Sequence, residues 1–160
     1  MSQAIIIRVE GLAELKDKLQ DRTRIEAPVS RFLDRSAIYL QSRAREHITY
    51  VGAVDTTRTR GSIAVKPDGA FRREVGPNTT YAEKIEDGQE PGEWPPKGAL
   101  VPWMRRKGIP ASAEYLIRRK IGTQGIAARP FMAPAAQDTE DFIRKSVSTL
   151  VAEIEAEFAR

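Results

Sequence analysis

The feature that most constrains this fold is a run of apolar residues with helical spacing at positions 28–48. Apolar side chains recur there every three or four residues, which places them along one side of an α-helix. The remaining positions are rich in arginine and acidic residues, so the other side is expected to face solvent. Pro28 suits the first turn, where a proline costs no hydrogen bond. The buried side is predicted to consist of Val29, Leu33, Ala37, Leu40, Ala44 and Ile48.

A second long helix is predicted near the end of the chain. It is expected to begin at Pro134 or Asp138 and to continue to about Phe158. Because two such helices each have an apolar side, the fold must supply another layer for them to cover. The apolar side of this helix is predicted to be Ile143, Val147, Leu150, Ile154 and Phe158, with Phe142 and Val151 beside it.

Three segments have the alternation that is typical of strands, at positions 4–9, 62–66 and 72–76. Pro67-Asp68-Gly69 separates the last two and indicates a hairpin, because proline presets the turn and glycine accepts a positive φ. We therefore predict an α+β fold, in which a small antiparallel sheet of three to four strands is packed by two long helices with extended loops. The 160 residues are expected to form a single domain.

The rest of the chain is predicted to consist of short helices and loops. One helix is expected at positions 12–19, and another from a cap at Thr79 or Thr80 to Asp87, ended by Gly88. Prolines and glycines exclude regular structure over 89–98, so a loop arm is predicted at about 89–103. Beyond it we expect a helical turn at 103–107, a helix at 113–121 that Ser112 caps and Gly122 closes, and a second loop at 123–129.

Composition argues against catalysis. The chain has no cysteine and one histidine, His47, which excludes thiolate chemistry and the common zinc motifs. Glu83, Glu86 and Asp87 could form a metal or acid–base cluster, but their helical spacing favours an acidic solvated face, because a metal site needs converging ligands that nothing else in the chain supplies. Ser62 and Ser112 have no neighbouring base in the sequence, and the chain has no phosphate-binding loop. We predict no enzyme, no cofactor and no metal.

No membrane association is predicted either. The longest apolar run, at positions 4–7, is far too short to span a bilayer, and it lacks a signal cleavage pattern. The protein is therefore expected to be made and kept in the cytosol.

Two basic triplets are the strongest candidates for binding. They are Arg105-Arg106-Lys107 and Arg118-Arg119-Lys120, with Tyr115 between them. Such residues suit contact with phosphates, as in DNA binding. They suit equally well the acidic last helix of a neighbouring subunit. Trp94 and Trp103 either pack in the core or belong to an exposed arm that docks on another protein.

Four segments in chain order place turn residues beside charged or aromatic ones. They contain Val9-Glu10-Gly11-Leu12; Val54, Asp55, Thr56, Ser62 and Ile63; Val75, Gly76, Tyr81, Ala82, Glu86 and Gly88; and Arg129, Pro130, Phe131, Pro134 and Ala135. Together they resemble the gene-product-ten-like tail-component family of long-tailed bacteriophages, also described as neck or tail-completion proteins. Ala53, Thr57 and Thr59 depart from the family pattern. At Thr57 the pattern has glycine, which matters if this turn needs a positive φ.

The resemblance implies a structural virion protein, made in the host cytoplasm, that assembles as a ring at the joint between head and tail. The ring, expected to be a hexamer, would complete or terminate the tail tube and connect it to the head-side connector, with non-specific contact to DNA in its lumen. Alternatives are a collar or assembly-only neck protein and a DNA-binding module. Asp55 and Glu86 are expected to bond backbone N–H groups or arginines. The predicted interface residues are Asp55, Arg58, Arg60, Glu86, Trp94, Trp103, Arg105, Arg106, Lys107, Arg118, Arg119, Lys120, Arg129 and Phe131.

Overall fold

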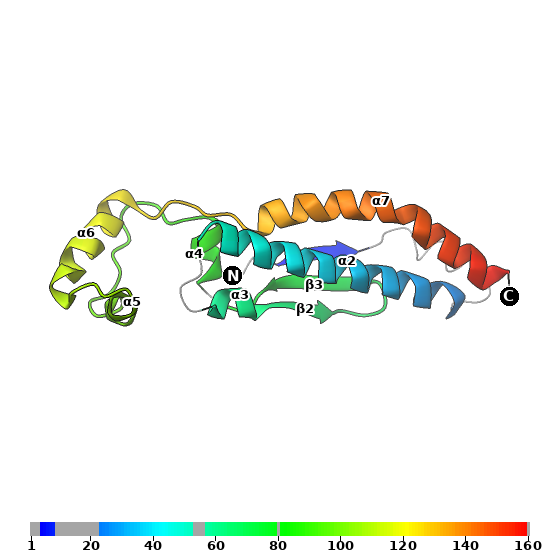
Figure 1. Ribbon diagram of the computed structural model, residues 1–160, viewed down its shortest axis with the longest axis horizontal. Helices are drawn as coiled ribbons and strands as arrows, with labels where there is room; N and C mark the ends of the chain where they lie inside the picture. The colour runs from blue at the N-terminus through cyan, green and yellow to red at the C-terminus, as the bar shows by residue number, and fades with distance from the viewer. Residues whose placement is uncertain (1–3, 9–22, 53–56, 80, 160) are drawn as a thin grey trace.

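The computed structural model describes residues 4–8, 23–52, 57–79 and 81–159. They form an elongated molecule with two regions (Figure 1). One region, the body, contains a sheet and two long helices. The other, the arm, contains shorter helices and projects from one end of the body. The predicted helix at 12–19 and the predicted interface residue Asp55 lie outside the described residues.

A three-stranded antiparallel sheet forms one layer of the body. Its strands are β1 (Ile5–Arg8), β2 (Ile63–Pro67) and β3 (Arg72–Pro77), in the order β1-β3-β2. Val75 lies at the centre, paired with Ile5 on one side and Val65 on the other. The predicted hairpin between β2 and β3 is confirmed, since Gly69 has a φ of 78° and Asp68 N–H donates to the Arg72 carbonyl.

Helix α2 (Thr23–Tyr50) covers this sheet, and its predicted apolar side is confirmed. All six predicted residues, from Val29 to Ile48, are at most 1% exposed. The prediction for Pro28 is wrong, because the helix begins at Thr23 and Pro28 lies in its second turn. Pro28 has no N–H to donate at this position, and its ring is fully buried.

Helix α7 (Met132–Phe158) runs antiparallel to α2 along its length (Figure 1). Pro134 falls in its first turn as expected, but the helix begins at Met132 and not at Asp138. Its predicted apolar side is only partly correct. Leu150 and Ile154 pack against Ile25, Val29 and Leu33, while Val147, Val151 and Phe158 are 44%, 47% and 41% exposed. Contact with a single helix buries a stripe narrower than the apolar pattern. The fully covered positions of α7 are Met132, Ala135 and Thr139.

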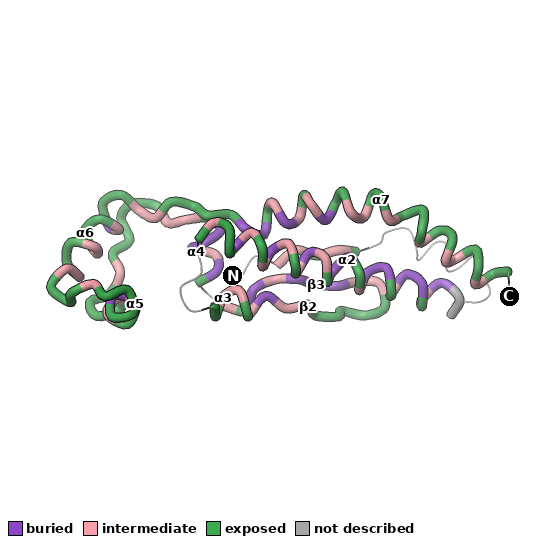
Figure 2. The backbone as a smooth tube through the Cα atoms, viewed as in Figure 1, coloured by how far each residue is buried: buried purple, intermediate pink, exposed green. Residues whose placement is uncertain are grey.

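The main core lies where α2, the sheet and the first turn of α7 meet. It joins Leu40, Ala44 and Ile48 of α2 to Ile63, Val75 and Phe131. Figure 2 shows buried positions along α2 and β3 and at the start of α7, and few in the arm. The α+β class predicted from the sequence is confirmed. Within the described chain, neither long helix contains a stretch apolar enough to cross a bilayer.

Two short helices adjoin the sheet, α3 (Arg58–Ser62) and α4 (Ala82–Glu86). Thr57 precedes α3 with a φ of 58°, so the position where the family pattern has glycine does adopt the left-handed conformation. The predicted threonine cap of α4 is not seen at Thr79, whose carbonyl, not its hydroxyl, accepts the Ala82 N–H at 3.3 Å. Thr80 lies outside the described residues. Gly88 ends this segment with a φ of 77°.

The arm contains α5 (Val101–Arg106), a 3₁₀ turn (Ala111–Ala113) and α6 (Glu114–Gln124). The helical turn predicted at 103–107 is confirmed within α5. The cap predicted at Ser112 is wrong, because Ser112 lies inside the 3₁₀ turn and makes no capping bond. Gly122 does not close α6. It is buried inside the helix, which ends at Gly125 with a φ of 73°.

Candidate assembly interface

Glu86 anchors the root of the arm. Its side chain is buried, and its two oxygens accept the N–H groups of Phe131 and Met132 (Oε2, 2.8 and 2.9 Å) and of Ala133 (Oε1, 2.9 Å). N–H groups at the start of a helix have no partner within it, and the helix dipole favours a negative charge there. The prediction that Glu86 bonds backbone N–H groups is confirmed. Glu86 was also predicted to lie at an interface, but its carboxylate is buried and bonded within its own chain.

Two segments connect the arm to the body, and we call them the stalk (residues 88–92 and 125–129). Gln89 and Ile126 exchange backbone hydrogen bonds of 2.9 and 2.8 Å, and Arg129 N–H donates to the Ile85 carbonyl at 2.8 Å. The segments approach so closely that a Cβ on Gly125 would lie 2.1 Å from the Gln89 carbonyl oxygen. A Cβ on Gly88 would lie 2.5 Å from the Ile126 oxygen. Both glycines are therefore required by the geometry of the stalk.

Inside the arm, the proline-rich segment is fastened to α6. Arg118 Nε donates to the Pro95 carbonyl at 2.7 Å, and Gly92 N–H donates to the Gly122 carbonyl at 2.8 Å. The Trp94 ring lies directly over Gly122, where any Cβ would collide with the indole. Trp94 is nevertheless 45% exposed, and Trp103 is half-buried. Trp94 thus packs within the arm, and neither tryptophan belongs to the body core.

Both basic triplets lie on the arm. Arg105, Arg106 and Lys107 lie at the end of α5, while Arg119 and Lys120 lie on α6, and all five are exposed. Arg118 is the exception, since it is half-buried and bonded to Pro95. Tyr115 and Leu116 of α6 are 61% and 63% exposed beside Arg119 and Lys120. The arm therefore presents a surface of basic and apolar side chains.

The acidic residues of α7 are partly engaged within the chain. Glu153 contacts Arg35 at 2.9 Å and Arg31 at 3.8 Å, and Glu157 contacts Arg31 at 3.8 Å. Glu140 pairs with Arg144 one turn further along the same helix. Asp141 and Glu155 are exposed on α7.

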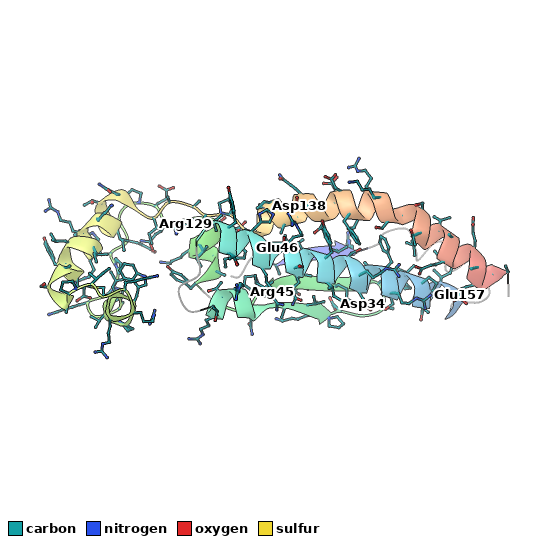
Figure 3. The ribbon with its side chains drawn as sticks, in the orientation of Figure 1. Asp34, Arg45, Glu46, Arg129, Asp138 and Glu157 are labelled. Carbon is teal, nitrogen blue, oxygen red and sulfur yellow. The ribbon has the colours of Figure 1, made fainter. Side chains whose placement is uncertain are left out.

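A charged cluster that sequence reasoning missed joins the two long helices near the arm (Figure 3). Asp138 Oδ2 accepts from His47 Nε2 at 2.9 Å and from Arg43 Nε at 2.8 Å. These bonds hold the pKa of Asp138 below its ordinary value, the His47 bond contributing most. The bond to Asp138 raises the pKa of Arg43 in turn. A sequence without pairing information gives no reason to join His47 to Asp138.

Arg73 was also missed. It occupies the core-facing side of β3, is 4% exposed, and donates to Asp34 Oδ1 at 2.6 Å and to Ser30 Oγ at 2.7 Å. Its remaining nitrogen donates to the carbonyls of Gly69 and Arg72. The alternation of β3 was a usable signal, since it places residue 73 on the same side as Val75.

The other predicted interface residues are dispersed. Arg58 is exposed, and Arg60 is half-buried with Nη1 3.4 Å from Thr49 Oγ1. Arg129 is exposed at the base of the stalk (Figure 3). Phe131 is 0% exposed, so it belongs to the body core and offers no surface to a partner.

Among the described residues, no group of three histidine or acidic side chains converges to hold a metal ion. Searches against protein-family models, curated proteins and solved structures found no match to this chain. The resemblance to phage tail components therefore stays a prediction, and the surface of the arm is the principal candidate site.

Proposed function

We propose that this chain is a structural virion protein that forms a ring at the joint between head and tail of a bacteriophage. In this role it completes or terminates the tail and connects it to the head-side connector. No catalytic step belongs to this function. The surfaces that matter are those between copies and those toward the axial neighbours.

One observation carries the proposal: three of the segments on which the family resemblance depends meet at the root of the arm. The Ser62 carbonyl, in the segment at 54–63, accepts a hydrogen bond from the Asn78 N–H, in the segment at 75–88, at 3.1 Å. Glu86, also in the segment at 75–88, accepts hydrogen bonds from the N–H groups of Phe131 and Met132 in the segment at 129–135. These contacts between the three segments support treating them as one family signature. The element they build holds the arm in place.

The shape of the molecule supports assembly. An arm that projects beyond its own core has surface to offer a neighbour, and a contact between two different surfaces repeats until a ring closes. The exposed tyrosine, leucine and basic residues on α6 are of the kinds found at protein interfaces, with arginine and tyrosine enriched there.

The mass of the purified protein, measured by light scattering over a concentration series and combined with electron micrographs, tests this function. Closed rings with an open channel are the expected result. A protein that forms only closed dimers would contradict it, because a two-fold contact uses up the surface that a ring must repeat.

A DNA-binding module is the second candidate, and the five exposed basic residues of the two triplets favour it. It predicts that the isolated subunit binds duplex DNA with an affinity that falls steeply with salt. The matched variants are Arg119→Glu with Lys120→Glu on the arm, and Lys66→Glu with Lys145→Glu, at exposed positions of the body, as the control. If only Arg119→Glu with Lys120→Glu abolishes DNA binding, and the protein stays monomeric at every concentration, the DNA-binding function is supported and the ring function is contradicted.

A further inference from the structure

The two ends of the molecule differ in charge. Residues 97–125, which include α5 and α6, contain seven basic residues and one acidic residue. The C-terminal half of α7, residues 146–158, contains three acidic residues, Glu153, Glu155 and Glu157, and no basic one. The arm and the C-terminal half of α7 lie at opposite ends of the long axis (Figure 1). Opposite charges at opposite ends favour end-to-end contact between copies.

An apolar stripe follows the C-terminal half of α7. Val147, Val151 and Phe158 are 44%, 47% and 41% exposed, and their spacings of four and seven place them on one side of the helix. Leu150 and Ile154, which pack on α2, lie beside this stripe on the same apolar side of the helix, so the stripe is the uncovered border of that side. Glu155 is exposed one turn beyond Val151. The stripe is therefore apolar with an acidic border.

A complementary patch lies on α6. Tyr115 and Leu116 are the most exposed large hydrophobic residues of the arm, at 61% and 63%. Arg119 and Lys120 follow Leu116 by three and four positions, so all three share one side of the helix. The patch is apolar with a basic border, which is the opposite of the stripe on α7.

We propose that the Tyr115–Leu116 patch of one copy seats on the Val147–Val151 stripe of a neighbouring copy, with Arg119 and Lys120 facing Glu155 of that neighbour. The contact rests on the proposed ring function and names the surfaces that would close the ring. Pairing of two α7 stripes would place acidic residues together, and pairing of two arms would place basic residues together. Charge therefore selects the mixed contact, in which the two surfaces differ.

Engineered cysteines test the contact directly, because the native chain has none. Leu116→Cys and Val151→Cys are made as separate variants of different tag length, mixed in equal amounts and oxidised. A disulfide between the two variants is expected to form about tenfold more than between Leu116→Cys and Lys66→Cys, an exposed control position on β2, because a seated contact raises the local thiol concentration. Equal yields would overturn the proposal, as would a predominance of Val151 pairs.

Charge exchange gives a second, independent test. Arg119→Glu with Lys120→Glu in the Leu116→Cys variant is expected to lower the mixed yield about tenfold, and Glu155→Arg in the partner should restore part of it. All these positions are exposed, and circular dichroism checks that each variant folds. If the yield of the mixed disulfide is the same with and without the charge reversal, the proposed contact is wrong. If rings form but the mixed yield matches the control, this contact is wrong while the proposed function stands; if neither forms, both are wrong.

Discussion

The body and the arm are held together in different ways. In the body, Leu33, Leu40, Ile48 and Ile63 are 0% exposed and belong to continuous apolar clusters. In the stretch from 89 to 130, which is described in full, Met104 and Gly122 alone are buried. An arm with so little core cannot obtain its order from the hydrophobic effect alone. It depends on the close approach of the two stalk segments, on individual hydrogen bonds such as that from Arg118 to the Pro95 carbonyl, and on the anchor at Glu86.

The largest expected effect is the loss of a body side chain. Leu40→Ala should lower the free energy of unfolding by about 2–5 kcal/mol, because it removes buried methyl groups and leaves a cavity. The matched change in the arm, Leu116→Ala, should alter it by less than about 0.5 kcal/mol, since Leu116 is 63% exposed. Urea denaturation followed by circular dichroism measures both. Similar losses at the two positions would break the comparison and show that the arm has a core of its own.

The joint between the two regions should give the next effect. Glu86→Gln keeps the shape of the side chain but directs an amide N–H at backbone groups that are themselves donors, so we expect a loss of about 1–3 kcal/mol. Hydrogen exchange at Phe131, Met132 and Ala133 should also accelerate, since these amides lose their acceptor. Glu90→Gln, at an exposed position of the stalk, is the control and should change neither. If hydrogen exchange at all three amides is unchanged in Glu86→Gln, Glu86 does not anchor the arm.

Much of the body could be predicted from the sequence because its elements are long and periodic. The apolar side of α2 was predicted residue by residue, and the hairpin was predicted from Pro67-Asp68-Gly69. The side of α7 was predicted less well. Periodicity reports which residues are apolar but not how wide a surface the partner covers, so Val147 and Val151 were expected in the core.

The arm was predicted least well, because its determinants are not periodic. Prolines and glycines marked residues 89–98 as irregular, but the sequence gave no sign that Gly88 and Gly125 allow the close approach of the two stalk segments. Gly122 was predicted to end a helix, but it lies inside α6 and the Trp94 ring packs against it. The Asp138 cluster was missed for a related reason: His47 and Asp138 are 91 positions apart, and only the packing of α7 on α2 brings them together. The bonding of Glu86 to backbone N–H groups was expected from the family resemblance, whereas the spacing of Glu83, Glu86 and Asp87 alone suggested a solvated face.

A smaller, local effect is expected in the stalk. Gly125→Ala places a Cβ against the Gln89 carbonyl, so the two stalk segments must separate. Exchange at the Gln89 and Ile126 amides should rise about tenfold, while the free energy of unfolding of the body should change by less than about 0.5 kcal/mol. Gly108→Ala is a close control, because Gly108 also has a positive φ but nothing within 4 Å of its Cβ position. If both variants behave alike, backbone strain and not close approach explains the result.

The smallest expected effect is on the acid stability of the body, through the charge cluster at Asp138. His47 and Arg43 lower the pKa of Asp138 from its ordinary value of 3.8, so folding favours the ionised carboxylate. Its contribution is therefore fully present above the unfolded pKa of about 3.8 and is lost as the pH falls through the lower folded value. Asp138→Asn should be less stable than the native chain at neutral pH, and the difference should shrink below about pH 4.

Denaturation across a pH series measures this difference, with Asp141→Asn as a control at an exposed position of the same helix. The effect should be modest because the Asp138 side chain is 35% exposed and solvent screens its partners. The contact joins α7 to α2 inside the body, so the stalk amides of Gln89 and Ile126 should not respond to the variant. A response there would mean that the charge cluster, and not Glu86 alone, fixes the arm to the body, and the division between the two regions would have to be redrawn at α7.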